Sequence, residues 1–339
     1  MRTGLWIAGA TVALAAAGYT GAWFYGANRL EREIAAWKED AEGNGVSITH
    51  DEVQIGGFPL GLTAVIPDLQ IRNEAEGASI EAAPIRLSTT LWDPDHLEYD
   101  FSGKHSVLVV QGLQTTQATF QVGAGRGEVW LEDGGRTDRM TASDLKIVSR
   151  DGIVGIAGLE VSGAFTRKPS DPSAETMQAR YSLTGVDLTT RLGIKLIEPP
   201  IERLQIELAA TGPFLEIFED STVVDWAEAG GVVTLRDLTL EWSGLTLTAS
   251  GSGSFDAELR PSGSVTLVSA GFEESLDALD ARGVLPPPIG DIVRSLTQRF
   301  IVPGGSGGKS QLIVPVTAAE GILSVGGEPM GRVPSLKRL

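Results

Sequence analysis

The chain has 339 residues and is strongly acidic, with 27 lysine and arginine residues against 44 aspartate and glutamate residues and a formal net charge of −17. This balance disfavours a nucleic-acid partner, because such binding depends on lysine and arginine displacing counterions from phosphates. It also disfavours broad electrostatic adhesion to anionic lipid. The chain has no cysteine, which excludes a disulfide framework, a cysteine-ligated zinc ion and a thiol nucleophile.

The N-terminal stretch predicts a membrane anchor. Residues Leu5 to Tyr25 carry no charge and are long enough to cross a bilayer as one helix. Arg2 precedes them, so the positive-inside rule places residues 1–4 in the cytoplasm. Trp6 and Trp23, together with Tyr25, lie near the two ends, where aromatic rings favour the membrane interface. A cleaved signal peptide is the alternative, but the uncharged run is longer than a typical signal core.

The helix is expected to continue beyond the anchor, over residues 26–43. Leu30, Ile34 and Trp37 recur at three- and four-residue spacing, which predicts one apolar stripe along this extension. The remainder, residues 44–339, is then a periplasmic body. The localisation expected from this arrangement is the bacterial inner membrane, with a single membrane crossing and nearly all of the mass outside the cytoplasm.

The body shows the alternation of apolar and polar residues that is typical of strands. Short alternating segments follow one another with glycine, asparagine and aspartate clusters between them, which predicts antiparallel meanders. The 42 glycines suit many turns and bulges. The expected strands are Val46 to Ile55 with a break near His50, Leu62 to Ile71, Ile80 to Leu91, His105 to Leu113, Thr116 to Val122, Gly127 to Leu131, Met140 to Val148, Ile153 to Val161, Tyr181 to Leu188, Ile201 to Ala210, and several within Val232 to Ala270.

Few helices are expected in the body. Pro213 to Gly230 has roughly helical spacing, and two short helices are expected around Pro286 to Pro288. The order of elements contains no alternation of strand and helix, which disfavours a doubly wound fold. The fold class is therefore mostly β (α+β): an elongated, twisted antiparallel sheet with a few covering helices.

No pattern predicts a catalytic residue, a cofactor site or a metal site. Gly304 to Gly308 matches the serine-hydrolase motif around Ser306, but the motif requires a following helix and a strand follows here. His50, Asp51 and Glu52 are neighbours in a strand pattern, so Asp51 points away from His50 and Glu52. Asp93 to Asp100 is rich in carboxylates and is expected to be a solvated loop; Gly123 to Gly127 is expected to be a tight turn.

The segment "QIGGFPLGLT" predicts a stiff corner between two strands. Gly56 and Gly57 permit backbone angles that other residues avoid, with a positive φ expected at Gly57. Pro59 fixes its own φ and biases Phe58 toward an extended conformation. An aromatic ring held in this way is expected to plug the end of a hydrophobic layer and be buried there, in preference to contacting a ligand.

The chain also carries a family likeness. The N-terminal anchor, the "GGFP" corner, the "LW" at Leu91 and Trp92 and the ending "LIVPVTAAEGILSVGGEPMGRVPSL" together resemble an alphaproteobacterial family known as domain of unknown function 2125. The segment "LTLEWSGLTLTASGSGSFDAELRPSGSVTLVSAG" resembles the C-terminal ends of AsmA-like envelope proteins. That second resemblance implies an inner-membrane-anchored protein with a long β-sheet body, implicated in phospholipid traffic and outer-membrane biogenesis. Neither resemblance implies catalytic residues.

These features support more than one function. The leading hypothesis is a non-enzymatic periplasmic protein whose sheet binds or passes an apolar ligand, a lipid, in envelope maintenance. The alternative is a scaffold with a closed β core that contacts another envelope protein. A serine hydrolase using Ser306 is the remote alternative. An open apolar groove favours the first hypothesis, and a filled core with a flat exposed patch favours the second.

Overall fold

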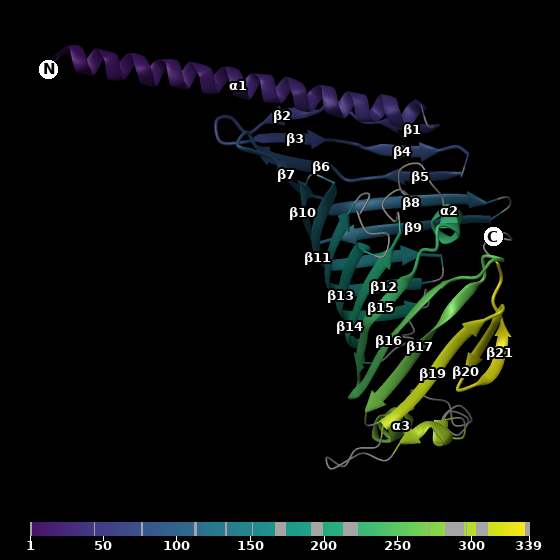
Figure 1. The fold of residues 1–339 in the computed structure, drawn as a ribbon. Helices are drawn as coiled ribbons and strands as arrows, with labels where there is room; N and C mark the ends of the chain where they lie inside the picture. Colours follow the sequence, from purple (N-terminus) through teal and green to yellow (C-terminus); the bar gives the residue numbers. More distant parts are fainter. Residues whose placement is uncertain are drawn as a thin grey trace. The chain divides into compact units, whose positions relative to one another are not determined.

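The computed structural model describes residues 2–43, 45–75, 77–111, 114–132, 134–150, 152–166, 174–190, 199–212, 223–270, 272–281, 295, 297–302 and 311–335. It divides into two compact units. Unit 1 comprises residues 1–131 and 146–150, and unit 2 comprises residues 132–145 and 151–339. The chain is mostly antiparallel β-sheet with an N-terminal helix and a few short helices, which confirms the predicted class at that level (Figure 1).

Unit 1 consists of one long helix and a set of short strands. Its elements are α1 (Arg2–Gly43), β1 (Val46–Thr49), β2 (Gln54–Gly56), β3 (Leu62–Ile66), β4 (Gln70–Asn73), β5 (Ala78–Glu81), β6 (Ile85–Thr90), β7 (Asp93–Asp100), β8 (Gly103–Gln111), β9 (Gln114–Val122) and β10 (Ala124–Glu132). One run of paired strands is β2–β3–β6–β7–β10, and a second is β1–β4–β5–β8–β9. Strand β11 (Gly135–Ser149) is divided between the two units.

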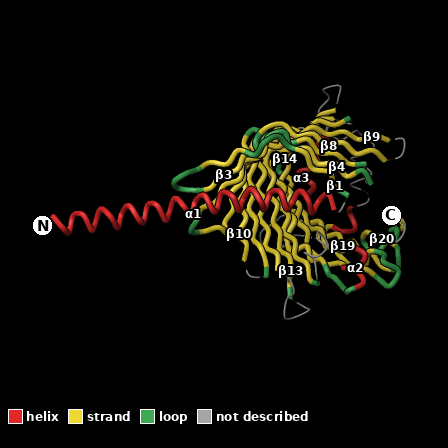
Figure 2. Tube along the Cα trace, turned by 90° about the horizontal axis from the view of Figure 1, so that it is seen from above, coloured by secondary structure: helices red, strands yellow, loops and turns green. Residues whose placement is uncertain are grey.

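The second half of α1 covers the strands of unit 1. Ile34 of α1 is buried with Ile48, Ala64, Ile66 and Leu69, and Leu30 and Ala41 pack against this cluster. Figure 2 shows the first half of α1 extending beyond the strands of the same unit. The predicted stripe is thus confirmed at its first two positions, whereas Trp37 lies at its margin with 44% of its surface exposed. Among the described residues, no helix is both long and apolar enough to qualify as a membrane span.

Unit 2 is a continuous antiparallel sheet with short helices. Its elements are β12 (Gly152–Thr166), β13 (Glu175–Thr190), β14 (Ile201–Thr211), α2 (Val223–Glu228), β15 (Val233–Trp242), β16 (Leu245–Phe255), β17 (Pro261–Ala270), α3 (Phe272–Ala281), η2 (Gln298–Phe300), β18 (Ile301–Val302), β19 (Gln311–Ala319), β20 (Ile322–Val325) and β21 (Glu328–Arg332). The strands pair in the order β12–β13–β14–β15–β16–β17–β19–β20–β21, and β18 also pairs with β19.

Several expected boundaries were wrong, and proline explains two of them. The strand expected over Leu62 to Ile71 is split at Pro67, and the strand expected over Ile80 to Leu91 is split at Pro84. Proline has no N–H to donate to a strand ladder, so each strand ends beside it. Of the helix expected over Pro213 to Gly230, the structure describes α2; the region around Pro286 to Pro288 lies outside the described residues.

The acidic segment Asp93 to Asp100 is strand β7, not a solvated loop. Its carboxylate Asp100 is directly opposite Arg86 on one neighbouring strand and Arg126 on the other. Opposite charges across a ladder stabilise the pairing. Hydrogen bonds from the Ser102 backbone and side chain lower the pKa of Asp100, and the two arginines add to this shift. The glycine-rich turn expected over 123–127 was also wrong, because β10 begins at residue 124.

Candidate functional site

One face of the unit 2 sheet is apolar across several neighbouring strands. Directly opposite residues of an antiparallel ladder lie on the same face, so the register identifies which side chains meet. One row across β15, β16, β17, β19 and β20 contains Leu235, Gly251, Val265, Val316 and Val325. The next row contains Val233, Gly253, Gly263, Ala318 and Leu323. Neither row carries a polar side chain.

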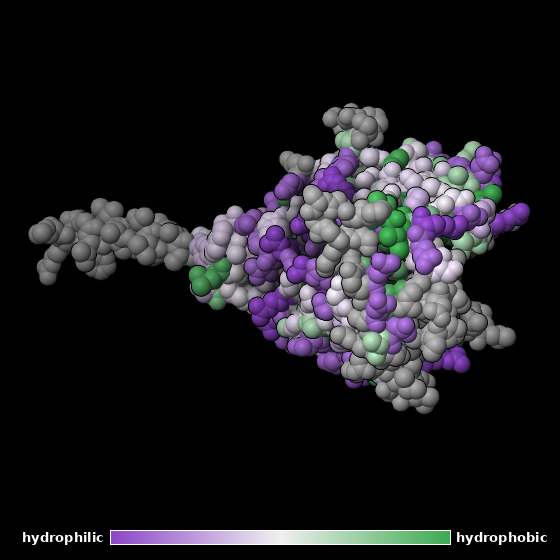
Figure 3. All heavy atoms as spheres, turned by 90° about the horizontal axis from the view of Figure 1, so that it is seen from below, coloured by the Kyte–Doolittle hydropathy of each residue, from purple (hydrophilic) through white to green (hydrophobic). Residues whose placement is uncertain are grey.

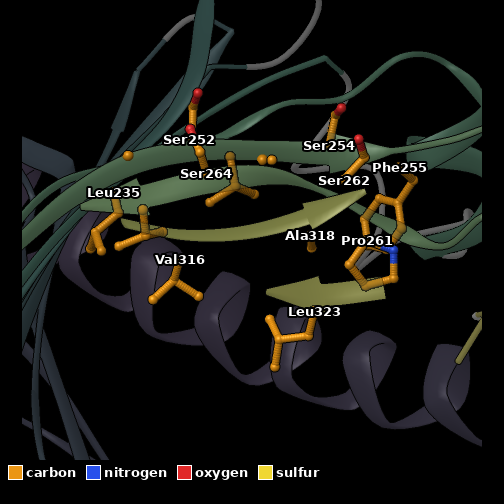
Figure 4. A pocket seen from close by; sticks show the side chains of 15 residues that line it. Leu235, Ser252, Ser254, Phe255, Pro261, Ser262, Ser264, Val316, Ala318 and Leu323 are labelled. Carbon is orange, nitrogen blue, oxygen red and sulfur yellow. The ribbon is translucent and has the colours of Figure 1, made fainter. Parts of the chain in front are cut away.

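This face is hollowed into an apolar groove of about 370 Å³. Its lining includes Leu235, Phe255, Val316, Ala318 and Leu323 (Figure 4). The serines of β16 and β17 alternate with the apolar rows, and their hydroxyl groups therefore face the other side of the sheet. The groove is consequently an apolar surface on one face of these strands, and the opposite face is polar.

Glycines form the floor of the groove. A Cβ atom at Gly251 would clash with the carbonyl oxygen of Ser264, and one at Gly263 would clash with that of Ser252. Gly253 and Gly263 are directly opposite one another, so no side chain fills the space above this part of the ladder. At Gly251 and Gly263 the neighbouring backbone comes too close for a side chain, so the floor is bare backbone, and larger apolar residues surround it.

Helix α2 fills the apolar face beside the groove. Trp226 is 3% exposed and packs in a cluster with Met177, Ala210 and Leu259. Its indole Nε1 donates to the carbonyl oxygen of Thr211 at 2.8 Å, which satisfies the polar atom of the ring. Phe255 stands edge-on to the indole at 6.2 Å between ring centroids and also lines the groove. The Trp226 cluster thus forms a wall of the groove.

A polar pocket of about 790 Å³ lies at the turns that end the groove-lining strands. Its lining includes Glu258 and Arg260 from the β16–β17 turn, Glu320 from the β19–β20 turn and Arg332 from the end of β21. Asp256 accepts the backbone N–H of Arg260 at 2.9 Å and its guanidinium Nε at 2.7 Å. The backbone hydrogen bond from Arg260 is the largest cause of a lowered pKa at Asp256. The sheet therefore offers an apolar groove and a charged pocket side by side.

The predicted corner is present, but Phe58 does not have the predicted burial. Gly57 has φ +99°, as expected, and a Cβ there would lie 2.7 Å from the carbonyl oxygen of Gly61. Phe58 is 52% exposed, so it does not plug a hydrophobic layer. The buried aromatic is Trp23, which is 7% exposed and donates Nε1 to the Gly61 carbonyl oxygen at 2.7 Å. Phe58 stands edge-on to Trp23 at 5.4 Å between ring centroids.

The structure also gives the positions of the remaining corner and anchor residues. Gly56 ends β2, and the carbonyl oxygen of Pro59 accepts a hydrogen bond from the Tyr19 hydroxyl. Tyr25 is exposed on α1. Leu5 and Trp6 lie in the helical backbone of α1, and their side chains are outside the described residues.

The residues weighed for chemistry do not come together. The Nδ1 atom of His50 lies 2.7 Å from the carbonyl oxygen of Asp51, its chain neighbour. His96 stacks on Trp130 at 4.8 Å and lies 3.8 Å from Asp93 and 3.7 Å from Glu128. Within the described ranges, no group of histidine, aspartate and glutamate side chains is arranged to hold a metal ion. Ser306 lies outside the described residues.

The fold and this site define a mostly antiparallel β protein with an apolar groove on its second unit. The family described as "Uncharacterized protein conserved in bacteria (DUF2125)" matches residues 23–334, and the chain belongs to it. The match begins at Trp23, which is the first buried residue among the α1 side chains that the structure describes. No curated protein and no solved structure matches the chain.

Proposed function

We propose that this protein is anchored in the bacterial inner membrane and that its periplasmic β body binds or passes an apolar ligand, a lipid, in envelope maintenance. The observation that carries the proposal is the groove lined by Leu235, Phe255, Val316, Ala318 and Leu323. Its volume of about 370 Å³ lies within the range of small-molecule sites, which is about 300–1,000 Å³.

The composition of the site supports a lipid more than a polar metabolite. A polar ligand needs hydrogen-bonding groups inside its pocket, because a polar group buried without partners is costly. The two rows of side chains on this face are aliphatic, aromatic or glycine and provide none. The adjoining pocket with Arg260, Arg332, Glu258 and Glu320 supplies charged groups only at the ends of the strands. This arrangement suits a molecule with an apolar chain and a polar end.

The proposed location depends on the N-terminal segment. Leu5 to Tyr25 has no charged residue and follows Arg2, which favours a single crossing with the body in the periplasm. The resemblance to AsmA-like envelope proteins agrees with a role in moving phospholipid. Membrane anchoring would place the groove in the compartment in which such traffic occurs.

The alternative of a scaffold with a closed core has less support. A closed core requires that the apolar faces of the sheet cover one another, and the groove is an apolar face that the described residues leave accessible. An apolar patch of this kind on a monomeric protein marks an interaction site. Its concave form favours a chain-like ligand over a flat protein surface.

The proposal is tested by filling the groove. Ala318→Trp places an indole in the groove, whereas Thr317→Trp places the same side chain on the opposite, exposed face of β19. The full chain is purified gently from membranes, and bound lipid is quantified by mass spectrometry. We expect Ala318→Trp to retain about tenfold less lipid than wild type, which corresponds to about 1.4 kcal/mol. Thr317→Trp should retain the wild-type amount. Equal retention by both variants, or no lipid on the wild type, contradicts the proposal.

A further inference from the structure

Unit 1 carries a group of exposed large apolar side chains beside residues 19–26 of α1. Each is more than half exposed, and together they form what we call the collar: Phe24, Tyr25, Phe58, Leu60 and Trp92. Single exposed apolar residues are ordinary on protein surfaces, but a gathered set marks an interaction site. Figure 3 shows hydrophobic surface where α1 joins the strands of unit 1.

The collar residues come from segments that are distant in sequence and held together by specific contacts. The loop at residues 57–61 is fastened to α1 by two hydrogen bonds, from Tyr19 to the Pro59 carbonyl and from Trp23 to the Gly61 carbonyl. The turn after β6, which carries Trp92, is held by its neighbour Leu91. A Cβ at Gly26 of α1 would lie 2.9 Å from Leu91 and 3.0 Å from Leu62.

These contacts explain why the collar residues remain exposed. The inward positions are occupied by Trp23, Leu62 and Leu91, so Phe58, Leu60 and Trp92 are left outside. A loop that could fold these side chains inward would gain burial, but the hydrogen bonds from α1 hold it in place. Specific contacts therefore hold the apolar side chains of the collar in exposed positions.

We propose that the collar inserts into the surface of the lipid bilayer, at the boundary between headgroups and acyl chains, beside the membrane-anchored part of α1. This inference rests on the membrane anchoring in the proposed function. The collar is continuous with the uncharged run Leu5 to Tyr25, since Phe24 and Tyr25 belong to both. Aromatic rings favour this boundary, and the acidic chain has little electrostatic attraction to anionic lipid. Apolar insertion is then the means by which unit 1 contacts the membrane.

Charged residues limit the depth of insertion. Arg29 follows Tyr25 by one turn of α1 and pairs with Glu33, and Asp93 follows Trp92 directly. Charged groups are costly in the hydrocarbon region, so they remain in the headgroup layer or in water. The collar therefore enters the interface shallowly. Phe58, at the glycine and proline corner, is assigned to membrane contact instead of to the core.

The test uses single cysteines in the full chain, which has no cysteine of its own. Leu60→Cys and Trp92→Cys are labelled with an environment-sensitive fluorophore and reconstituted into phosphatidylcholine vesicles. Lipids with a quencher high on the acyl chain report shallow insertion, and aqueous iodide reports contact with water. Trp37→Cys is the matched control, because this exposed aromatic lies about 18 Å further along α1 than Tyr25. Ala13→Cys, within the uncharged run, reports whether α1 is in the bilayer.

We expect the probes at residues 60 and 92 to be blue-shifted, quenched by the lipid quencher and protected from iodide. The probe at residue 37 should behave in the opposite way. Probes at 60 and 92 that iodide reaches, with a lipid-quenched probe at 13, overturn the collar and leave the anchor standing. Probes protected from both quenchers indicate a protein contact and also overturn it. If the probe at 13 is itself in water, the anchoring proposal fails together with the collar, whereas the lipid content of the groove variants is measured separately.

Discussion

The clearest energetic prediction concerns Trp23 and Phe58, an aromatic pair with unequal burial. Trp23→Ala removes a buried indole, for which about 3–5 kcal/mol is expected, and leaves the Gly61 carbonyl without its donor, which adds about 1–3 kcal/mol. Phe58 buries only about half of its surface, so its truncation loses about half of a full transfer term of about 1.5–3 kcal/mol. The edge-on ring pair adds about 0.5–1.5 kcal/mol. Phe58→Ala should thus cost about 1–3 kcal/mol.

The assay is native-state hydrogen exchange of the β3 amides in the full chain, which reports the free energy of local opening. Wild type, the two single variants and the double variant form a cycle whose coupling energy should be about 0.5–1.5 kcal/mol, the value of the ring pair. Phe58→Leu should recover most of the Phe58→Ala loss, because it restores apolar burial. A Phe58→Ala cost equal to that of Trp23→Ala, or an absence of coupling, would refute the assignment of Trp23 as the buried partner.

Further outcomes follow from individual contacts. Gly57→Val should destabilise the corner and lower the protection of β3, because a β-branched residue is an outlier at φ +99°; protection equal to wild type contradicts this. Trp226→Phe keeps most of the burial but removes the donor to the Thr211 carbonyl, so β14 protection should fall by about 1–3 kcal/mol. The pKa of Asp256 in the folded protein is lowered, chiefly by the hydrogen bond from the Arg260 backbone N–H. The ionised carboxylate therefore stabilises the β16–β17 hairpin at pH values above the ordinary pKa of 3.8, and this stabilisation is lost as the pH falls through the lowered pKa of the folded state. Asp256→Asn should lower hairpin protection at neutral pH and remove that acid-dependent loss; an unchanged acid profile sinks this attribution.

Alternation was sufficient to predict most strands of unit 2. Leu238, Leu240 and Trp242 alternate in one strand, and Leu245 and Leu247 alternate in the next. The register confirms that they share a face, because Leu240 is opposite Leu247 and Trp242 is opposite Leu245. This success has a local cause, since side chains alternate between the two faces along each regular stretch of a strand. The bulge between Leu235 and Leu238 of β15 interrupts the alternation and brings both residues to the same face.

The groove could not be predicted in the same way. It depends on Gly253 of β16 being opposite Gly263 of β17, and the register between two strands is not a property of either strand alone. A shift of one residue would place serines over the same floor. The signal that was present in the sequence is the run "SGSGS" facing "PSGSV" across a short turn. It indicates a hollow only after the pairing is known.

The role of Phe58 was missed for a related reason. The corner residues predict a rigid turn, and the turn is present. Burial of the ring, however, was decided by competition with Trp23, a residue of the N-terminal helix that had been assigned to the membrane interface. The sequence "GGFP" gives no information about Trp23, which is distant in sequence. The acidic strand β7 could not be predicted from its own residues, because the arginines opposite Asp100 belong to the two neighbouring strands.

Photocrosslinking from within the groove shows whether a lipid occupies it. A photoreactive phenylalanine analogue is introduced at Val265, which lines the groove, or at Thr266, the next residue of β17, which is exposed on the opposite face. The full chain is irradiated in membranes, and the mass of each adduct is measured. We expect lipid-mass adducts from position 265 and none from position 266. An absence of lipid adducts at 265, or equal adducts at both positions, would contradict the proposal that the groove holds a lipid.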